Sequence, residues 1–174
     1  MGQGKKQRRV EFRAAVVLYG GLSLAVYEGG ASTELLHLVR ASSGPSTALS
    51  RHYRRLLDAL EADFTVDVIA GTSAGGINGV FLARALATGA DIGVLNDLWQ
   101  RHGDFSVLAD WGNQQPESVL NGETFRAKLA EAIDQMQPRD GRGLAAPPKP
   151  LVQDLDLFVT STDLAGHYWE RQDS

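Results

Sequence analysis

The sequence contains no cysteine, which excludes disulfide bonds, a thiolate nucleophile and zinc sites built on cysteine. Histidine is also scarce: His37, His52, His102 and His167 are scattered, without the spacing of a metal-binding motif. We therefore expect no metal site. His52 lies with Tyr53 on the apolar stripe of a predicted helix, and we expect both side chains to pack rather than catalyse. The absence of cysteine also suits a reducing compartment.

Long apolar runs are missing as well, since no run approaches the roughly 20 residues of a membrane-spanning helix. Basic residues near the N-terminus precede the apolar stretch Ala14–Val26, an order that could form a secretory signal cleaved near Ala31. However, Glu11 and Arg13 alternate with apolar side chains, and Gly20–Gly21 interrupts the stretch. The favoured interpretation is a strand followed by a glycine loop.

Positive charge does not dominate the composition, because the formal net charge is -4 at pH 7. A general nucleic-acid-binding protein carries the opposite sign, so we expect no nucleic-acid partner. Hydrophobic residues make up 43% and charged residues 22% of the 174 positions, as in an ordinary globular domain. We expect residues 1–9 to be a disordered basic tail and residues 10–174 to form one domain, with a flexible proline-rich excursion over 137–150.

Strand-like and helix-like patterns alternate along the chain. Val10–Tyr19 ends in a continuous apolar stretch, which predicts a strand buried on both faces. Leu35, Leu38 and Val39 keep helical spacing, and a loop is predicted over 41–47. The remaining predicted helices are Leu49–Leu60, Ile77–Ala87, Ile92–His102 and Phe125–Met136, the last with a cap near Asn121, and the remaining strands are Val66–Ala70, Leu155–Thr160 and Gly166–Glu170. This order predicts an α/β layered fold with a mostly parallel sheet.

The hexapeptide Gly71-Thr72-Ser73-Ala74-Gly75-Gly76 lies between a predicted strand and a predicted helix. A G-x-S-x-G turn in that position lifts the serine hydroxyl out of the sheet and lets neighbouring backbone approach closely. A serine at the start of a helix also faces free backbone N–H groups, which favour developing negative charge. We therefore predict that Ser73 is a nucleophile. The alternative is that Ser73 merely caps the helix.

Two further glycines, Gly20 and Gly21, follow the first predicted strand. Glycines at the carboxyl end of a strand can turn backbone N–H groups toward a bound anion. A dinucleotide-binding loop is an alternative, but Leu22 interrupts the G-x-G-x-x-G pattern that such a loop requires. The two glycines are thus a second candidate part of the site around Ser73.

With these motifs, and with Thr162-Asp163-Leu164 closing a later strand, the sequence resembles the patatin-like phospholipase family from about Arg13 to its end. The segment Tyr19–Tyr27 is most similar to the bacterial patatin-related branch. The resemblance implies a three-layer α/β/α fold with a mostly parallel sheet. It also implies a lipid acyl hydrolase that uses a Ser/Asp dyad without histidine and needs no metal or organic cofactor.

Carried over to this sequence, the resemblance assigns Ser73 as nucleophile, Gly20 and Gly21 as part of the oxyanion loop, and the N–H of Ala74 as a further donor. The flanking Gly71, Thr72, Gly75 and Gly76 form the nucleophile elbow. The family's usual loop is Asp-Gly-Gly-Gly-x-Arg-Gly. Here Leu18 and Tyr19 precede the two glycines, and Ser23 and Leu24 stand where the arginine and last glycine would be.

The catalytic aspartate of the family lies in an Asp-Gly-Gly or Asp-Gly-Ala motif after the Thr-Asp-Leu strand. The Asp-Gly pair of this sequence, in Asp140-Gly141-Arg142, comes before that strand and is predicted to be a turn. Asp163 is expected to bond at a strand end, and Asp154 and Asp156 to face solvent. We therefore expect the catalytic aspartate beyond this chain, in the remainder of a parent protein, and a fold truncated at the C-terminus.

The expected partner is a lipid ester substrate, and the expected location is the cytoplasm, with peripheral contact at membranes left open. The alternative function is a catalytically inactive patatin-like module that binds lipid or a protein partner. That alternative is motivated by the departures in the glycine loop and by the missing Asp-Gly-Gly motif.

Overall fold

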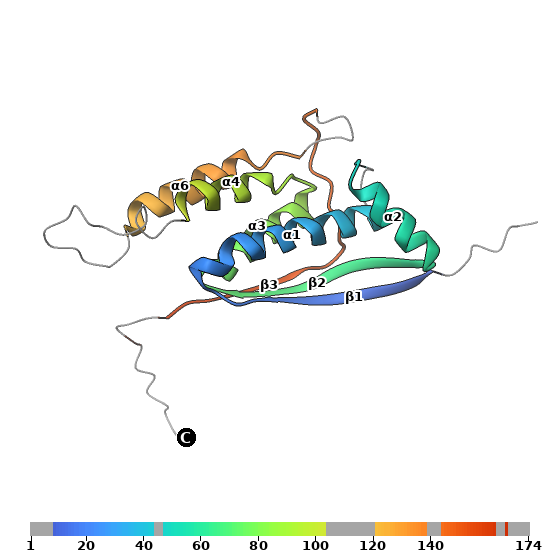
Figure 1. Ribbon diagram of the computed structural model, residues 1–174, viewed down its shortest axis with the longest axis horizontal. Helices are drawn as coiled ribbons and strands as arrows, with labels where there is room; N and C mark the ends of the chain where they lie inside the picture. The colour runs from blue at the N-terminus through green and yellow to red at the C-terminus, as the bar shows by residue number, and fades with distance from the viewer. Residues whose placement is uncertain (1–8, 44–46, 104–120, 139–143, 163–165, 167–174) are drawn as a thin grey trace, which may run out of the picture.

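The computed structural model describes residues 9–43, 47–103, 121–138, 144–162 and 166 (Figure 1). The strands are β1 (Val10–Leu18), β2 (Ala62–Thr72) and β3 (Asp156–Thr160), and the helices are α1 (Leu22–Ser43), α2 (Ser50–Ala59), α3 (Ala74–Thr88), α4 (Gly93–His102) and α6 (Gly122–Gln135). Most of the expected basic tail, the Asp140–Arg142 turn, Asp163 and all but the first residue of the strand expected over Gly166–Glu170 lie outside the described residues.

The three strands form a parallel sheet in the order β1-β2-β3. In the described part of the chain, α1, α2 and α3 lie over one face of this sheet, and α4 and α6 form a further layer on top of them (Figure 1). The expected α/β architecture with a parallel sheet is confirmed, and it is consistent with a three-layer α/β/α fold. Because the strands are parallel, their carboxyl ends lie at the same edge of the sheet, where β2 runs into α3.

The core lies between the sheet and its helices and is centred on α3. Phe81, Leu82 and Leu86 of this helix are almost completely buried, and they pack with Ile69 of β2 and Leu36 of α1. Small residues bring the helix close to the sheet, since a Cβ on Gly79 would lie 3.0 Å from Cγ2 of Ile69. Helix α3 is therefore the element on which sheet and outer helices are assembled.

The exposure of β1 differs from the sequence prediction. The strand was expected to be buried on both faces, yet Val10, Phe12 and Val17 are more than half exposed and Leu18 is its single buried residue. The physical reason is position: β1 is an edge strand, and no described helix covers the second face of the sheet. An apolar run shows that a strand is suited to burial but not which neighbours cover it.

Helix α1 is longer than predicted, because it begins at Leu22 and runs to Ser43 through Gly29 and Gly30. The loop predicted over 41–47 therefore begins three residues too early. Gly29 is needed for packing, since a Cβ there would lie 3.3 Å from Oδ1 of Asn96 and 3.5 Å from Cδ1 of Trp99. The contact with α4 keeps a helix-weakening residue inside the helix.

The predicted apolar stripe of α2 is only partly buried. Leu57 is buried and Tyr53 packs beside it, as expected, with its hydroxyl donating to Glu34. His52, by contrast, is exposed, so the prediction that it packs is wrong. Leu56 and Leu60 are also exposed, because α2 contacts the rest of the described fold along one narrow side.

The ends of the remaining elements follow local rules well. Asn121 caps α6, and its side chain accepts a hydrogen bond from the backbone N–H of Thr124 at 3.0 Å. Asp154 and Asp156 are exposed, as predicted.

Within the excursion over 137–150, the described residues form no helix or strand. The end of this segment is bonded to α3: Lys149 N–H donates to Thr88 O at 2.9 Å, and Leu151 N–H donates to Leu86 O at 2.8 Å.

None of the helices in the described residues has both the length and the apolar character that crossing a bilayer requires.

We predict that Leu82→Ala lowers the free energy of unfolding by about 2–5 kcal/mol, because it leaves a cavity at a fully buried position of α3. Leu60→Ala is the matched control, since the same atoms are removed from an exposed position and the expected change is within about 0.5 kcal/mol. Denaturant unfolding measures both values, and equal effects would contradict the assigned core.

Candidate active site

Ser73 occupies a sharp corner between the last residue of β2 and the first residue of α3. Its backbone has φ 54° and ψ -127°, a combination that side-chain-bearing residues rarely adopt and that stores conformational strain. The side chain is exposed and makes no capping hydrogen bond to α3, so the alternative that Ser73 serves as a side-chain cap is wrong. The strained corner therefore presents a hydroxyl at the surface rather than using it to complete the helix.

The corner requires glycine at Gly71 and Gly75. A Cβ on Gly71 would lie 2.4 Å from the carbonyl oxygen of Gly75, and a Cβ on Gly75 would lie 2.3 Å from that of Leu18. Both distances are far below van der Waals contact, so backbone packs directly on backbone here. The end of β1, the end of β2 and the first turn of α3 thus meet without intervening side chains.

The other elbow residues fit the same close packing. Thr72 is exposed and ends β2, and Ala74 is buried as the first residue of α3. A Cβ on Gly76 would lie 3.0 Å from Cγ1 of Val159, which places β3 against the first turn of α3 as well. All three strands therefore converge on the turn that follows Ser73.

The glycine loop after β1 lies directly against Ser73. A Cβ on Gly20 would lie 2.6 Å from the Ser73 Cβ and 3.3 Å from its Oγ, so only glycine leaves the hydroxyl uncovered. Gly21 has φ +134°, in the region that favours glycine, and its carbonyl oxygen accepts hydrogen bonds from the N–H groups of Leu24 and Ala25. Gly21 therefore turns the chain from β1 into α1 beside the Ser73 hydroxyl.

Two helix N-termini consequently flank the Ser73 hydroxyl, because α1 begins at Leu22 and α3 begins at Ala74. The first N–H groups of a helix have no partner within it, and the helix dipole places partial positive charge at this end. Such an arrangement stabilises an anion without a cationic side chain. The glycine loop after β1 and the turn at Ser73, which the sequence predicted as two parts of one site, therefore lie side by side.

A buried polar cluster, which sequence reasoning missed, ties the helices behind this site. Asn78 of α3 accepts a hydrogen bond from Nε1 of Trp99 at 2.7 Å, and its Nδ2 donates to Oε2 of Glu28 at 3.3 Å and to the carbonyl oxygen of Ala25 at 3.1 Å. Asn78 is completely buried, and Glu28 of α1 is nearly so. The cluster joins α1, α3 and α4 and thereby fixes the two helix N-termini relative to each other. A polar residue inside the apolar run of α3 is the signal that could have revealed it.

Within the described part of the chain, the Ser73 hydroxyl makes no hydrogen bond that would identify a catalytic base. Asp156 lies at the opposite end of β3, since it is paired with Val68 rather than with the end of β2. Glu28 is already bonded to Asn78. Asp140 and Asp163 are outside the described residues.

His37 is not placed to act as the base. His37 lies fifteen residues beyond the first residue of α1, about 22 Å along the helix at 1.5 Å per residue. Burial, followed by the neighbouring Arg40 guanidinium, lowers the pKa of His37, which keeps its imidazole neutral near pH 7.

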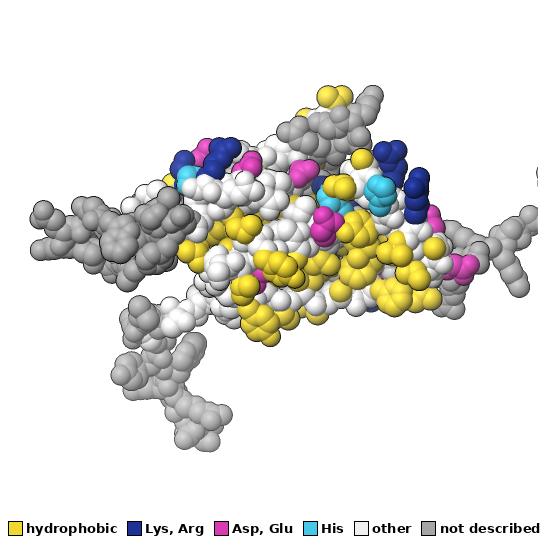
Figure 2. Space-filling model, in the orientation of Figure 1, with side chains coloured by type: hydrophobic (Ala, Val, Ile, Leu, Met, Phe, Trp, Pro, Cys, Tyr) yellow, Lys and Arg dark blue, Asp and Glu magenta, His cyan; other side chains and the backbone are white. Residues whose placement is uncertain are grey.

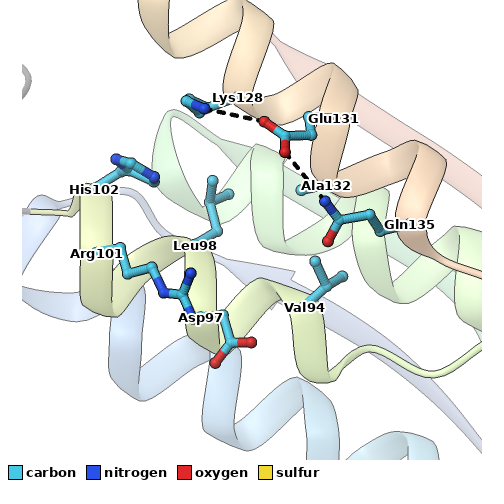
Figure 3. A pocket seen from close by; sticks show the side chains of 9 residues that line it. All are labelled: Val94, Asp97, Leu98, Arg101, His102, Lys128, Glu131, Ala132 and Gln135. Carbon is cyan, nitrogen blue, oxygen red and sulfur yellow. Dashed lines mark hydrogen bonds and ion pairs between the residues drawn. The ribbon is translucent and has the colours of Figure 1, made fainter.

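No group of three or more potential metal-ligating side chains is found among the described residues. A cavity of about 250 Å³ lies between α4 and α6, in the helix layer farthest from the sheet (Figure 3). Its rim carries Arg101, His102 and Lys128, and the Lys128 ammonium is paired with Glu131 at 3.0 Å. None of its lining residues belongs to the Ser73 site.

Comparisons with known proteins agree with this geometry. Residues 16–170 match the family model described as patatin-like phospholipase. The chain is 32% identical over 173 residues to a protein of Mycobacterium tuberculosis named "Uncharacterized membrane protein Rv3479". The aligned region covers 90% of this chain but spans only 16% of that relative's length. No solved structure is significantly similar to the chain.

We predict that Gly75→Ala disrupts the elbow, because its new methyl group would overlap the carbonyl oxygen of Leu18. The expected loss is about 3 kcal/mol or more in the free energy of unfolding. Gly30→Ala is the control: a Cβ there meets nothing within 4 Å, and the helical position should gain up to about 1 kcal/mol. Equal stability of the two variants in denaturant unfolding would refute the close backbone packing.

We also expect Trp99→Phe to destabilise the protein by about 1–3 kcal/mol, because Oδ1 of Asn78 loses its donor inside the core. Because Asn78 also bonds Glu28, Asn78→Leu alone should cost more, and the double variant should lose less than the sum of the two single variants. A thermal melt of the single and double variants measures the coupling. If the losses simply add, the hydrogen bond contributes nothing.

Proposed function

Because the chain belongs to the patatin-like phospholipase family, whose members are lipid acyl hydrolases, we propose that Ser73 is the nucleophile of a serine acyl-ester hydrolase. The single observation that carries the proposal is the strained, exposed Ser73 with the Gly20 loop packed against its side chain. A serine that only supported the fold would have no need of a strained backbone and a bare glycine neighbour.

In the proposed reaction the Ser73 Oγ attacks the acyl carbonyl carbon of a lipid ester, and a carboxylate removes its proton. Backbone N–H groups of Gly20, Gly21 and Ala74 stabilise the oxyanion that forms. The tetrahedral intermediate then collapses, the alcohol leaves with the proton, and water hydrolyses the acyl-serine. The proton acceptor is proposed to be an aspartate outside this chain, as in the Ser/Asp dyad that the resemblance implies.

The proposed substrate is a lipid ester, and the proposed setting is a protein that contacts membranes peripherally from the cytoplasm. The family supports a lipid partner, and the relative in Mycobacterium tuberculosis is named as a membrane protein. Because the chain spans a small part of that relative, the remainder of a parent protein is proposed to complete the catalytic site.

A catalytically inactive lipid-binding module is the second candidate. The observation that favours it is the absence of any hydrogen bond between the Ser73 hydroxyl and a carboxylate in the described residues. Without a base the serine remains protonated, which typically costs a hundredfold to about ten-thousandfold in rate.

A fluorophosphonate probe applied to the full-length protein distinguishes the two candidates. We expect covalent labelling of the wild type, no labelling of Ser73→Ala, and a fall in ester hydrolysis of about a thousandfold or more in that variant. Ser161→Ala is the matched control, because Ser161 is another exposed serine, next to the carboxyl end of β3. Equal labelling of wild type and Ser73→Ala would exclude Ser73 as nucleophile, and an unlabelled wild type would favour the inactive module.

A further inference from the structure

The surface beside Ser73 is apolar and exposed. We define it as the site-end surface, formed by Tyr19 of the glycine loop and by Leu24, Val26 and Tyr27 of α1. Tyr19 is 72% and Tyr27 74% exposed, and the side chains of Leu24 and Val26 are about half exposed. In Figure 2 hydrophobic side chains are visible near this end of α1, and a further group lies around α2 at the other end. Aromatic side chains of this size are seldom left so accessible without a partner.

Charge is absent from the same surface. Between Val17 and Thr33 the single charged residue is Glu28, and it is buried against Asn78. The first twelve residues of α1, about 18 Å of helix, therefore present no charge to solvent. In the whole sequence 22% of residues are charged, so this stretch differs clearly from an ordinary solvated helix face.

The amino end of the sheet, opposite Ser73, carries charged side chains. There Arg9 pairs with Asp58 at 2.9 Å and with Asp63 at 3.0 Å, and midway along the strands Arg13 pairs with Asp67 at 2.6 Å. Val10, Phe12, Leu56 and Leu60 are also more than half exposed at that end, where charged side chains such as Arg9, Arg54 and Asp58 form ion pairs. Sheet and α1 thus differ in charge along the strands, from an amino end with ion pairs to a carboxyl end where α1 presents no charge beside Ser73.

From this polarity we infer that the site-end surface docks on the surface of a phospholipid bilayer and holds the Ser73 edge of the sheet against the lipids. Tyrosine and leucine are suited to this position, because their apolar parts enter the interface while the phenol stays hydrated. The surface carries no Lys or Arg, so docking depends on apolar contact and not on anionic lipid.

A bilayer fits this surface better than a protein partner. Gly20 and Gly21 connect Tyr19 to α1, and Gly20 lies against the Ser73 hydroxyl. The hydroxyl is therefore exposed at the edge of the apolar surface. A second copy seated over the whole surface would cover the hydroxyl, whereas a bilayer supplies esters to it; the remainder of the parent protein need only bring an aspartate to Ser73. The inference thus rests on the proposed function and specifies where the lipid substrate reaches the protein.

The absence of cysteine allows a direct test with a single environment-sensitive fluorophore on the 174-residue chain. With the fluorophore on Tyr27→Cys, phosphatidylcholine vesicles should shift the emission to the blue and raise its intensity, equally at low and high salt. Leu56→Cys is the matched control, since Leu56 is exposed at the charged end and should not respond. No shift at position 27, or an equal shift at both positions, would overturn the proposal.

Vesicle sedimentation provides an independent measurement. Val26→Asp combined with Tyr27→Asp should weaken partitioning onto phosphatidylcholine vesicles about tenfold or more, because two apolar side chains are lost from the interface. Leu56→Asp combined with Leu60→Asp adds the same charge at the other end and should leave partitioning unchanged. Circular dichroism confirms that both variants are folded, and equal partitioning of the two would contradict the assignment.

The outcomes separate this inference from the proposed function. Ser73→Ala should lose fluorophosphonate labelling in the full-length protein but retain vesicle binding. If the wild type is labelled but position 27 does not respond to vesicles, only the docking proposal is wrong. If position 27 responds but the wild type is not labelled, only the assignment of Ser73 as nucleophile is wrong. A fluorophore at position 27 of the full-length protein that is shielded before vesicles are added would assign the surface to another part of that protein.

Discussion

Direct backbone contact at the carboxyl end of the sheet is the constraint on which the site depends. The chain passes this point three times, at the end of β1, in the turn from β2 into α3 and at the end of β3. Gly20, Gly71 and Gly75 each lie where a methyl group would overlap a neighbouring atom. The absent side chains allow Ser73 to adopt its strained conformation and bring two helix N-termini beside its hydroxyl. The close backbone packing and the exposure of the Ser73 hydroxyl therefore both require glycine at these positions.

The strain at Ser73 must be balanced by rigid surroundings, and the buried cluster around Asn78 supplies part of that rigidity. A completely buried amide that satisfies both its donor and its acceptor is costly to disturb, because the alternative is an unpaired polar group in the core. The amide connects Glu28 of α1 with Trp99 of α4, and the ring of Trp99 packs against Phe125 of α6 at a centroid distance of 6.1 Å. A chain of contacts thus links the layer farthest from the sheet to the helix that begins at Ser73.

Features that depend on a few neighbouring residues could be predicted from the sequence, and those that depend on distant partners could not. The elbow follows from residues 71–76 alone, and the cap at Asn121 from its local pattern. The exposure of β1 depends on its place at the edge of the sheet, which no pattern within Val10–Leu18 contains. Similarly, Asn78 and Glu28 are fifty residues apart in sequence, so their pairing became visible only in three dimensions.

The attachment of residues 149–151 to the end of α3 has a consequence for the order of folding. Strand β3 reaches the sheet only after the chain has passed through α4, α6 and the proline-rich segment, and β2 and β3 residues that pair are separated by 88 positions, as in Val68 and Asp156. Closing so long a loop is slow, since contacts between distant segments form late. The bonds from Lys149 to Thr88 and from Leu151 to Leu86 place β3 beside a helix that is already in position. We therefore expect helix α3 to act as the template on which β3 is added during folding.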